Sequence, residues 1–465
     1  MRAAVAAGHP ATTAAGVEIL EEGGSAADAA VAASLASCVA ETVMTGLLGG
    51  GHGIYWDAQR GTVRNLDCFV AVPGLGGERR DSELVQLDVP FGEELVHYAI
   101  GPASCAVPGL PAGLDALWRE HGRLPWPRVV EPALRLAREG VEFPEAHAAC
   151  LAMLAPVMTM DAGARIYSPG GRLLQANERL EQPGLVAALE AVAAEGARTV
   201  YSGSLAAALL SLCDERGGLI TRADLDCSDA RWSEPVSVRY LDWTLVSRAG
   251  LSRVPETAAR LPRVRELDAT TRVLALVSAV GNGVGPETHT TNTTLVDDDG
   301  NACVLTTSLG LGSGDFLPGL DLHLNSMLGE SDLLLGPLDP GERMESMMAP
   351  TLVFDGDVPA LAAGAAGGTR LRGALLSVVS AILDEGSDAR EAVERPRLHA
   401  VGGTVNAEPG VDEAALDLLA GRGWSVRRWP ARHHYFGGVS VVSRLGAAGD
   451  PRRSGASASP RPRSR

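Results

Sequence analysis

Runs of small apolar residues, broken by glycines and polar clusters, divide much of the chain into helices. Residues 10–45 predict one helix-rich unit, in which Ser25 and Asp28 have the spacing of a capping box. The Ala-rich run that follows is suited to close packing against a sheet. The glycines at 49–51 interrupt this pattern, and we interpret them as a structural turn. Residues 180–215 again predict Ala- and Leu-rich helix.

Short stretches of alternating or β-branched residues predict strands elsewhere. Residues 289–309 are rich in Thr and Val around a turn, which predicts two adjacent strands. Further strands are expected at residues 54–56, 63–66, 350–354 and 360–363, followed by a helix over 371–385. Because strands and helices alternate with hairpins and not with regular βαβ units, the pattern indicates stacked helix and sheet layers. Residues 253–285 are the least regular, and the Ser/Pro/Arg-rich stretch 451–465 is expected to be disordered.

The composition is that of an ordinary globular protein, with 46% hydrophobic and 21% charged residues among 465. Its formal net charge of −17 argues against a nucleic-acid or anionic-membrane surface. The seven cysteines are scattered and never spaced as CxxC, so neither a disulfide framework nor a zinc site is expected. The first residues are too weakly apolar for a signal peptide, and we therefore expect a cytoplasmic protein.

Familiar catalytic signatures are absent from the sequence: it has no HExxH, GxSxG or phosphate-binding GxxxxGK[ST] motif. The strongest local feature is the Thr-rich segment at residues 288–302. Taken alone, this segment is a strand that leads into a hairpin, because threonine suits strands.

A series of short motifs in one order changes that interpretation. They occupy residues 9–10, 14–20, 23–32, 107–113, 122–126, 295–302, 312–314, 347–351, 367–368, 395–397, 435–438 and 449–453. With these motifs the chain resembles the γ-glutamyltranspeptidases, members of the N-terminal-nucleophile hydrolases. The resemblance implies a four-layer αββα sandwich and a proenzyme that cuts itself between His289 and Thr290. Residues 1–289 would form the large fragment and residues 290–465 the small one, intertwined as one globular domain and associated as a heterodimer.

The resemblance assigns the nucleophile to Thr290, whose hydroxyl would attack the carbonyl of His289. Cleavage would free an α-amine that is partly neutral at physiological pH and can act as the base for the hydroxyl. It also implies that Gly367 and Gly368 supply backbone N–H groups to an oxyanion, and that Ser308 supports the nucleophile. From the residues alone, the glycine pair could equally be a turn at the start of a helix, and Ser308 a surface serine on a strand.

The departures from the family fall on substrate recognition. The family's carboxylate-binding arginine would follow Asp67, where this chain has Phe69 close by and no arginine. Gly329 stands where the family has the aspartate that holds the substrate α-amine, and Glu330 or Asp332 could compensate. Asn292 replaces a histidine two residues after the nucleophile, and the segment between Tyr240 and Thr288 is shortened. The candidate substrate-binding residues are Phe69, Asn325, Ser346 and Met347.

These differences predict an autoprocessing amidohydrolase or acyltransferase that does not use glutathione efficiently, since each lost charge-assisted contact removes about 1.5–3 kcal/mol. A less polar amide, or a specialised metabolite in biosynthesis, would be the substrate, with water or an amine as acceptor. No metal, nucleotide or flavin cofactor is implied. Two alternatives stay open: a true γ-glutamyl hydrolase or transferase with a rebuilt clamp, and an unprocessed pseudoenzyme that serves as a binding protein.

Overall fold

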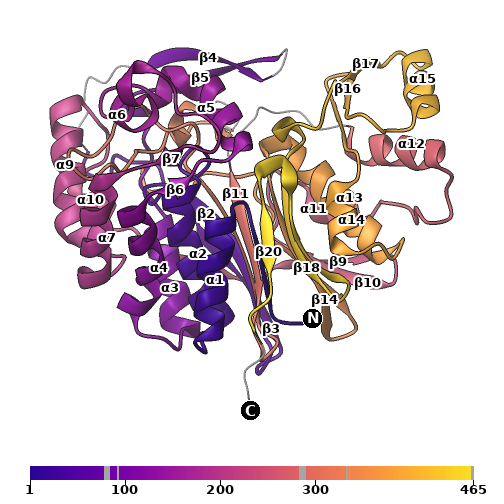
Figure 1. The fold of residues 1–465 in the computed structure, drawn as a ribbon, viewed down its shortest axis with the longest axis horizontal. Helices are drawn as coiled ribbons and strands as arrows, with labels where there is room; N and C mark the ends of the chain where they lie inside the picture. Colours follow the sequence, from indigo (N-terminus) through magenta and orange to yellow (C-terminus); the bar gives the residue numbers. More distant parts are fainter. Residues whose placement is uncertain (78–83, 92–93, 282–289, 331–332, 335, 462–465) are drawn as a thin grey trace.

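Two antiparallel sheets stacked face to face form the centre of the computed structural model, which describes residues 1–77, 84–91, 94–281, 290–330, 333–334 and 336–461 (Figure 1). The strand order of the seven-stranded sheet is β20(Ala456–Ala458), β1(Ala4–Ala7), β11(Thr291–Val296), β12(Ala302–Ser308), β2(Gly50–Asp57), β3(Thr62–Cys68) and β8(Arg231–Ser233). The order of the six-stranded sheet is β19(Gly446–Gly449), β18(Gly438–Ser443), β14(Val358–Ala366), β13(Thr351–Asp355), β10(Trp243–Ser247) and β9(Val236–Tyr240). The strand pairs predicted around the turns at residues 57–61 and 298–301 are confirmed, and the strands expected at 350–354 and 360–363 are β13 and β14.

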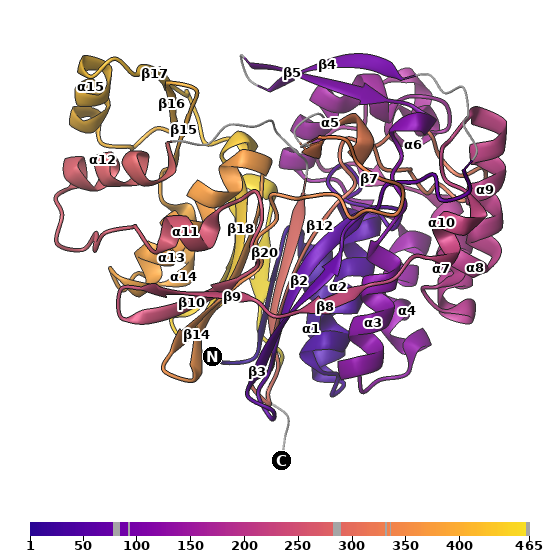
Figure 2. The same cartoon turned by 180° about the vertical axis from the view of Figure 1, so that it is seen from behind.

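Helices cover the outer face of each sheet (Figures 1 and 2). The helices on the side of the seven-stranded sheet are α1(Pro10–Glu21), α2(Ala26–Ala40), α3(Leu110–His121), α4(Trp126–Glu139), α5(Glu145–Met158), α6(Gly163–Tyr167), α7(Pro183–Glu195), α8(Thr199–Ser202), α9(Ser204–Arg216) and α10(Arg222–Asp226). Those that pack on the six-stranded sheet are α11(Val254–Ala258), α13(Leu371–Leu383) and α14(Ala389–Glu394). The expected four-layer αββα order is confirmed.

Smaller elements lie outside the four layers. One group combines α12(Ala269–Val280), α15(Glu413–Gly421) and the small sheet β15(Leu398–Val401), β16(Thr404–Ala407) and β17(Ser425–Arg428). The hairpin of β4(Val85–Phe91) and β5(Glu94–Ile100) and the pair β6(Val141–Glu142) and β7(Arg179–Leu180) lie on the other side. The segment that the sequence presents as least regular thus contains two helices, α11 and α12.

Helix α2 is buried along its whole length because its residues are small. Fifteen consecutive residues of this helix are buried, and they pack against β11, β12, α1 and α4. The predicted capping box is confirmed, since Ser25 and Asp28 satisfy each other's backbone N–H groups. A second carboxylate, that of Asp297, accepts the N–H of Ala26 at 2.9 Å. This contact fixes the start of α2 to the end of β11.

The space between the two sheets is apolar at one end and polar at the other. Apolar residues from both sheets, among them Trp56, Val304, Leu352 and Phe354, form a separate core cluster there. Toward the start of β11 the residues between the sheets become hydroxyl and amide side chains. This polar end holds the candidate site.

The glycine run at 49–51 corrects one expectation. Only Gly49 lies in a turn, whereas Gly50 and Gly51 belong to strand β2 and pair with Ser308 and Thr307. A Cβ atom on Gly50 would lie 2.8 Å from the backbone N of Val70, and one on Gly51 would lie 2.6 Å from the carbonyl O of Thr306. Glycine is needed here because neighbouring backbones approach closely, and not because the chain turns.

The expected disorder of residues 451–465 is wrong for the part that the structure describes, up to residue 461. Residues Ala456–Ala458 form β20, which pairs antiparallel with β1. Arg452 and Arg453 are buried, and the guanidinium of Arg452 binds the carboxylates of Glu408 and Asp450. The Ser/Pro/Arg composition hides this order, because specific long-range partners stabilise the segment.

The seven-stranded sheet alternates between the two sides of the expected cleavage point. β20, β11 and β12 follow residue 289, whereas β1, β2, β3 and β8 precede it. Strand β1 lies between β20 and β11, so each part of the chain completes the sheet of the other (Figure 1). Among the described residues, no helix has the length and apolar character needed to cross a membrane.

Candidate active site

Strands β11 and β12 bring Thr290 and Ser308 together. Thr291 pairs with Thr307, so the continued register places Thr290 opposite Ser308, one residue before the start of β11. Both residues are buried, at 2% and 1% exposure. Side chains alternate between the two faces of a strand, so Thr294 shares a face with Thr290, and Thr306 shares a face with Ser308. Thr294 donates to Ser440 of the six-stranded sheet, and Thr306 donates to Asn292 between the two sheets. His289, the other residue of the expected cleavage site, lies outside the described residues.

A small cavity joins most of the candidate residues. Its volume is about 10 Å³, which is room for about one water molecule. The lining residues are Phe69, Thr290, Ser308, Met327, Glu330, Leu333, Ser346, Met347, Met348, Gly368 and Leu371. The expected nucleophile, its supporting hydroxyl, one glycine of the pair and three of the four candidate substrate-binding residues therefore share one space.

The glycine pair follows β14 and precedes α13, as the sequence indicates. Gly367 and Gly368 have φ angles of 127° and 55°, in the region that favours glycine. A Cβ atom on Gly367 would lie 2.9 Å from the Cα atom of Gly437, so a side chain has no room there. These two constraints explain why both positions are glycine and why the backbone itself lines the cavity at Gly368.

Asn325 does not line this cavity. Its amide group donates to the carbonyl oxygens of Leu48 at 2.9 Å and Ala106 at 2.8 Å, and its oxygen accepts the N–H of Ala106 at 3.0 Å. With these bonds the side chain holds the loop that leads to Met327 and Glu330. Asn325 thus acts on the cavity through the position of that loop.

Glu330 supplies a carboxylate to a cavity whose other walls are largely apolar. The residue is 1% exposed and lines the cavity together with Thr290. The position one residue earlier, Gly329, lies against the backbone of Ala99, since a Cβ atom there would be 1.7 Å from its carbonyl oxygen. An aspartate at position 329 would not fit, whereas Glu330, which the sequence offers as a substitute, reaches the cavity. Asp332 lies outside the described residues.

Two arginines near the site donate hydrogen bonds to backbone carbonyl oxygens and do not line the cavity. Arg343 donates to the carbonyl oxygen of Phe69 at 2.7 Å, and Arg248 donates to the carbonyl oxygens of Ser346 at 3.0 Å and Met348 at 3.2 Å. Burial is the main reason that the pKa of Arg248 is lowered. Sequence reasoning missed both residues, because each is far along the chain from the segments that it positions.

Asp67 has a related role on the other side of Phe69. Its carboxylate accepts the N–H of Phe69 at 3.0 Å and lies 3.7 Å from Nδ1 of His52. The His52 ring stacks on the Phe69 ring at 5.4 Å between centroids, and burial keeps the pKa of His52 well below its ordinary value. The neutral imidazole therefore packs behind the Phe69 ring, which lines the cavity.

The sequence analysis also missed a buried carboxylate next to β11. Glu41, at the end of α2, accepts a hydrogen bond from Thr12 at 2.6 Å and another from Thr291, the neighbour of Thr290. Burial raises the pKa of Glu41 to about 7, and the two hydroxyl donors oppose this shift. Glu41 therefore binds the residue next to Thr290, and its raised pKa lies close to neutral pH.

Asn292 connects the two sheets beside the site. It accepts a hydrogen bond from Thr306 at 2.7 Å and donates to Thr294 at 2.9 Å, while its backbone oxygen accepts from Ser440 of β18 at 3.1 Å. A Cβ atom on Gly364 of β14 would lie 2.0 Å from its amide oxygen. The side chain that replaces the family's histidine is therefore tightly enclosed and does not enter the cavity.

Two antiparallel sheets between helix layers, with a buried threonine at the start of a central strand, define the architecture of an N-terminal-nucleophile hydrolase. The comparison with known proteins gives the family. The family described as Gamma-glutamyltranspeptidase matches residues 12–272 and 271–459. The chain therefore belongs to the γ-glutamyltranspeptidase family, whose members are hydrolases and transferases that act on amide bonds.

The relatives of the chain include both an acylase and a glutathione hydrolase. The chain is 27% identical to the "Acylase ACY 1 proenzyme" of Pseudomonas sp. strain V22, over 95% of this chain and 90% of the relative. It is 23% identical to the "Glutathione hydrolase proenzyme" of Bacillus subtilis, over 96% and 90%. Among solved structures, cephalosporin acylase from Bacillus halodurans superposes with a TM-score of 0.83 at 22% identity, over 98% of this chain and 95% of that one.

Proposed function

We propose that the chain is an autoprocessing amidohydrolase or acyltransferase in which Thr290 is the nucleophile. The observation that carries the proposal is the position of Thr290 opposite Ser308, in one cavity with Gly368. The Thr290 hydroxyl attacks the carbonyl carbon of His289, and the peptide nitrogen leaves as an amine when the bond shifts from N to O. Water then hydrolyses the ester, which frees the carboxylate of His289 and restores the hydroxyl of Thr290, now an N-terminal residue with a free α-amine.

The new α-amine serves as the base in turnover. It takes the proton of the Thr290 hydroxyl as the oxygen attacks the substrate amide carbonyl, and it returns that proton to the leaving amine. The backbone N–H groups at Gly367 and Gly368 stabilise the oxyanion, and Ser308 donates a hydrogen bond to the nucleophile oxygen. Water or an acceptor amine then attacks the acyl ester and regenerates Thr290.

For the substrate, we propose an acyl group that is mainly apolar and that can carry an amine, but no carboxylate. Phe69, Met327, Met347 and Met348 give the cavity an apolar wall, and Glu330 is its one ionisable carboxylate among the described lining residues. None of the described lining residues is an arginine. Glutathione, whose γ-glutamyl group carries an α-carboxylate, would place that charge beside Glu330 without a cation to compensate for it.

Self-cleavage can be tested on a denaturing gel of the purified protein. We expect two fragments that meet between His289 and Thr290, one intact chain for Thr290→Ala, and restored cleavage for Thr290→Ser. Thr293→Val is the matched control, because it removes a buried hydroxyl on the opposite face of β11. An intact wild-type chain would refute the proposal and favour a non-catalytic binding protein, and cleavage that persists in Thr290→Ala would exclude Thr290 as the nucleophile.

The substrate proposal can be tested with four anilides that differ only in their charged groups. They carry γ-glutamyl, 4-aminobutanoyl, glutaryl and butanoyl groups. We expect kcat/KM for the 4-aminobutanoyl and butanoyl anilides to exceed that of the γ-glutamyl anilide at least tenfold, with the glutaryl anilide slowest. Turnover of the γ-glutamyl anilide above the other three would instead show that the chain has rebuilt the family's clamp.

A further inference from the structure

A second and larger cavity lies apart from the candidate active site. Its volume is about 300 Å³, within the range of small-molecule sites. It is bounded by α12, by α13 and by the segments that follow α14 and β16. It shares no lining residue with the cavity around Thr290.

One wall of this second cavity is apolar, and it consists of Val273, Leu276, Val280, Leu398 and Val411. Gly373 and Ser377 form part of the opposite wall, on one face of α13. A Cβ atom added to Gly373 would meet nothing within 4 Å, so this glycine opens directly onto empty space.

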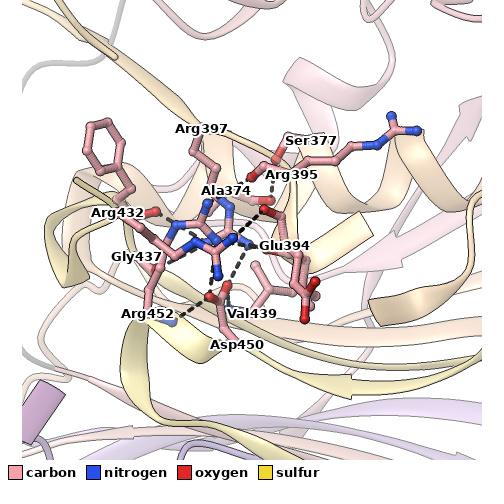
Figure 3. Close-up of polar contacts among 12 residues, drawn as sticks. Ala374, Ser377, Glu394, Arg395, Arg397, Arg432, Gly437, Val439, Asp450 and Arg452 are labelled. Atoms are coloured by element: carbon pink, nitrogen blue, oxygen red, sulfur yellow. Dashed lines mark hydrogen bonds and ion pairs between the residues drawn. The ribbon is translucent and has the colours of Figure 1, made fainter. Parts of the chain in front are cut away.

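Three guanidinium groups line the remaining wall. Arg272 and Arg395 both bind the carboxylate of Glu385, at 2.8 Å and 2.7 Å. Arg397 lies 2.5 Å from the carboxylate of Asp450, and the two residues face each other below Ser377 (Figure 3). The other lining carboxylate, that of Asp412, already accepts the N–H of Ala415 at the start of α15.

Two of these guanidinium groups each contain one N–H that lacks an acceptor among the described residues. Nε of Arg272 and Nε of Arg397 are buried, and neither has a hydrogen-bond acceptor among the residues that the structure describes. Both Nε atoms have almost no accessible surface, so a ligand in the cavity would instead meet the terminal nitrogens of Arg272 and Arg395, whose side chains are each 31% exposed. Burial and the neighbouring Arg452 lower the pKa of Arg397 to about 10, which an added negative charge would reverse.

We propose that this second cavity binds a small carboxylate with an apolar body. The carboxylate would accept from the exposed terminal nitrogens of Arg272 and Arg395, because oxygen anions are the strongest acceptors for guanidinium donors. The body of the ligand would pack against Val273, Leu276 and Val411. Asp450 compensates Arg397, whereas Arg272 and Arg395 share one lining carboxylate, that of Glu385.

Titration calorimetry of the full chain with hexanoate, hexanamide and hexylamine tests the proposal. We expect hexanoate to bind at least tenfold more tightly than either of the others. Gly373→Leu should fill the cavity and weaken hexanoate binding at least tenfold. Gly421→Leu is the matched control, a helical glycine on α15 whose Cβ would also meet nothing within 4 Å and which does not line the cavity.

Thermal unfolding of each variant shows whether it is folded, and Ser377→Leu provides a second way to fill the same space. Absence of hexanoate binding at millimolar concentration would overturn the proposal. Equal affinity for hexanoate and hexanamide would overturn the role of the arginines. Unchanged hexanoate affinity in folded Gly373→Leu and Ser377→Leu would place the binding elsewhere, for example at the cavity around Thr290, and would also overturn it.

Discussion

Arg397 and Asp450 form a buried ion pair with 2.5 Å between nitrogen and oxygen, although they are far apart in the sequence. Their side chains are 3% and 2% exposed. Asp450 also accepts the N–H of Val439 at 3.0 Å and binds Arg452 at 3.2 Å. One carboxylate therefore compensates two buried guanidinium groups and fixes the start of β18 (Figure 3).

Asp450→Asn should destabilise the protein strongly. Loss of one partner of a buried pair leaves an uncompensated charge, which costs about 3–5 kcal/mol. Chemical denaturation measures this loss as a lower free energy of unfolding. Asp355→Asn is the control, because the exposed pair of Arg444 and Asp355 has a similar separation of 2.7 Å but should contribute at most about 1 kcal/mol. Equal effects of the two substitutions would contradict the importance of burial.

Glu41 should make the stability of the protein depend on pH between about 4.5 and 7. Its folded-state pKa is raised, so the folded protein holds the proton more tightly than the unfolded chain does. The free energy of unfolding therefore falls as the pH rises through this interval, by roughly 3 kcal/mol in total. Below the interval the carboxyl is protonated and neutral in both states, so the protein keeps its full stability there.

Glu41→Gln should remove that component of the pH dependence. Urea denaturation at pH 4.5, 5.5, 7 and 8 would then show the variant gaining stability over the wild type as the pH rises. Exposed Glu234→Gln serves as the control and should follow the wild type. Parallel curves for Glu41→Gln and the wild type would contradict the assignment of the raised pKa to Glu41.

Ser308→Ala should slow the chemical step more than it weakens substrate binding. The hydroxyl lies opposite Thr290 and is expected to donate to its oxygen as charge develops, so its removal should lower kcat by roughly 100-fold. KM for the butanoyl anilide should change little, and the melting temperature should fall modestly, because the buried N–H of Gly310 loses its acceptor at 3.0 Å. Thr293→Val should leave kcat unaffected. A rise in KM at constant kcat would instead show that Ser308 binds the substrate.

Gly364→Ala should destabilise the contact between the two sheets. The new methyl group would lie 2.0 Å from the amide oxygen of Asn292, and overpacking of this kind costs about 1–3 kcal/mol. The cost should shrink in an Asn292→Ala background, because the clashing group is gone. Gly421→Ala, with open space around its Cβ, is the control. Equal costs of Gly364→Ala in both backgrounds would contradict the contact.

The sequence predicts the elements that depend on local patterns. The capping box of Ser25 and Asp28, the paired strands around Thr290 and Ser308, and the helix after Gly368 all follow from residues close together in the chain. The motifs of the family supply the register that places Thr290 at the start of β11. These features lie at short sequence separation, where propensity and periodicity carry information.

Contacts between distant segments could not be predicted in this way. Nothing local marks Glu41 as the partner of Thr291, or Arg343 as the group that holds Phe69. Residues 449–453 match one of the family's motifs, but the Ser/Pro/Arg-rich composition of residues 451–465 still suggests disorder. Its order comes from Glu408, β1 and β18, which no sequence window contains.

The position of β1 between β20 and β11 has a practical consequence for a chain cut at residue 290. The two polypeptides would be interleaved within one hydrogen-bonded sheet, so a purification tag on either one should retrieve both at equal stoichiometry without a covalent link. Each polypeptide alone would expose unpaired strand edges, which invite aggregation. The halves should therefore assemble from one precursor far better than from two separately synthesised chains.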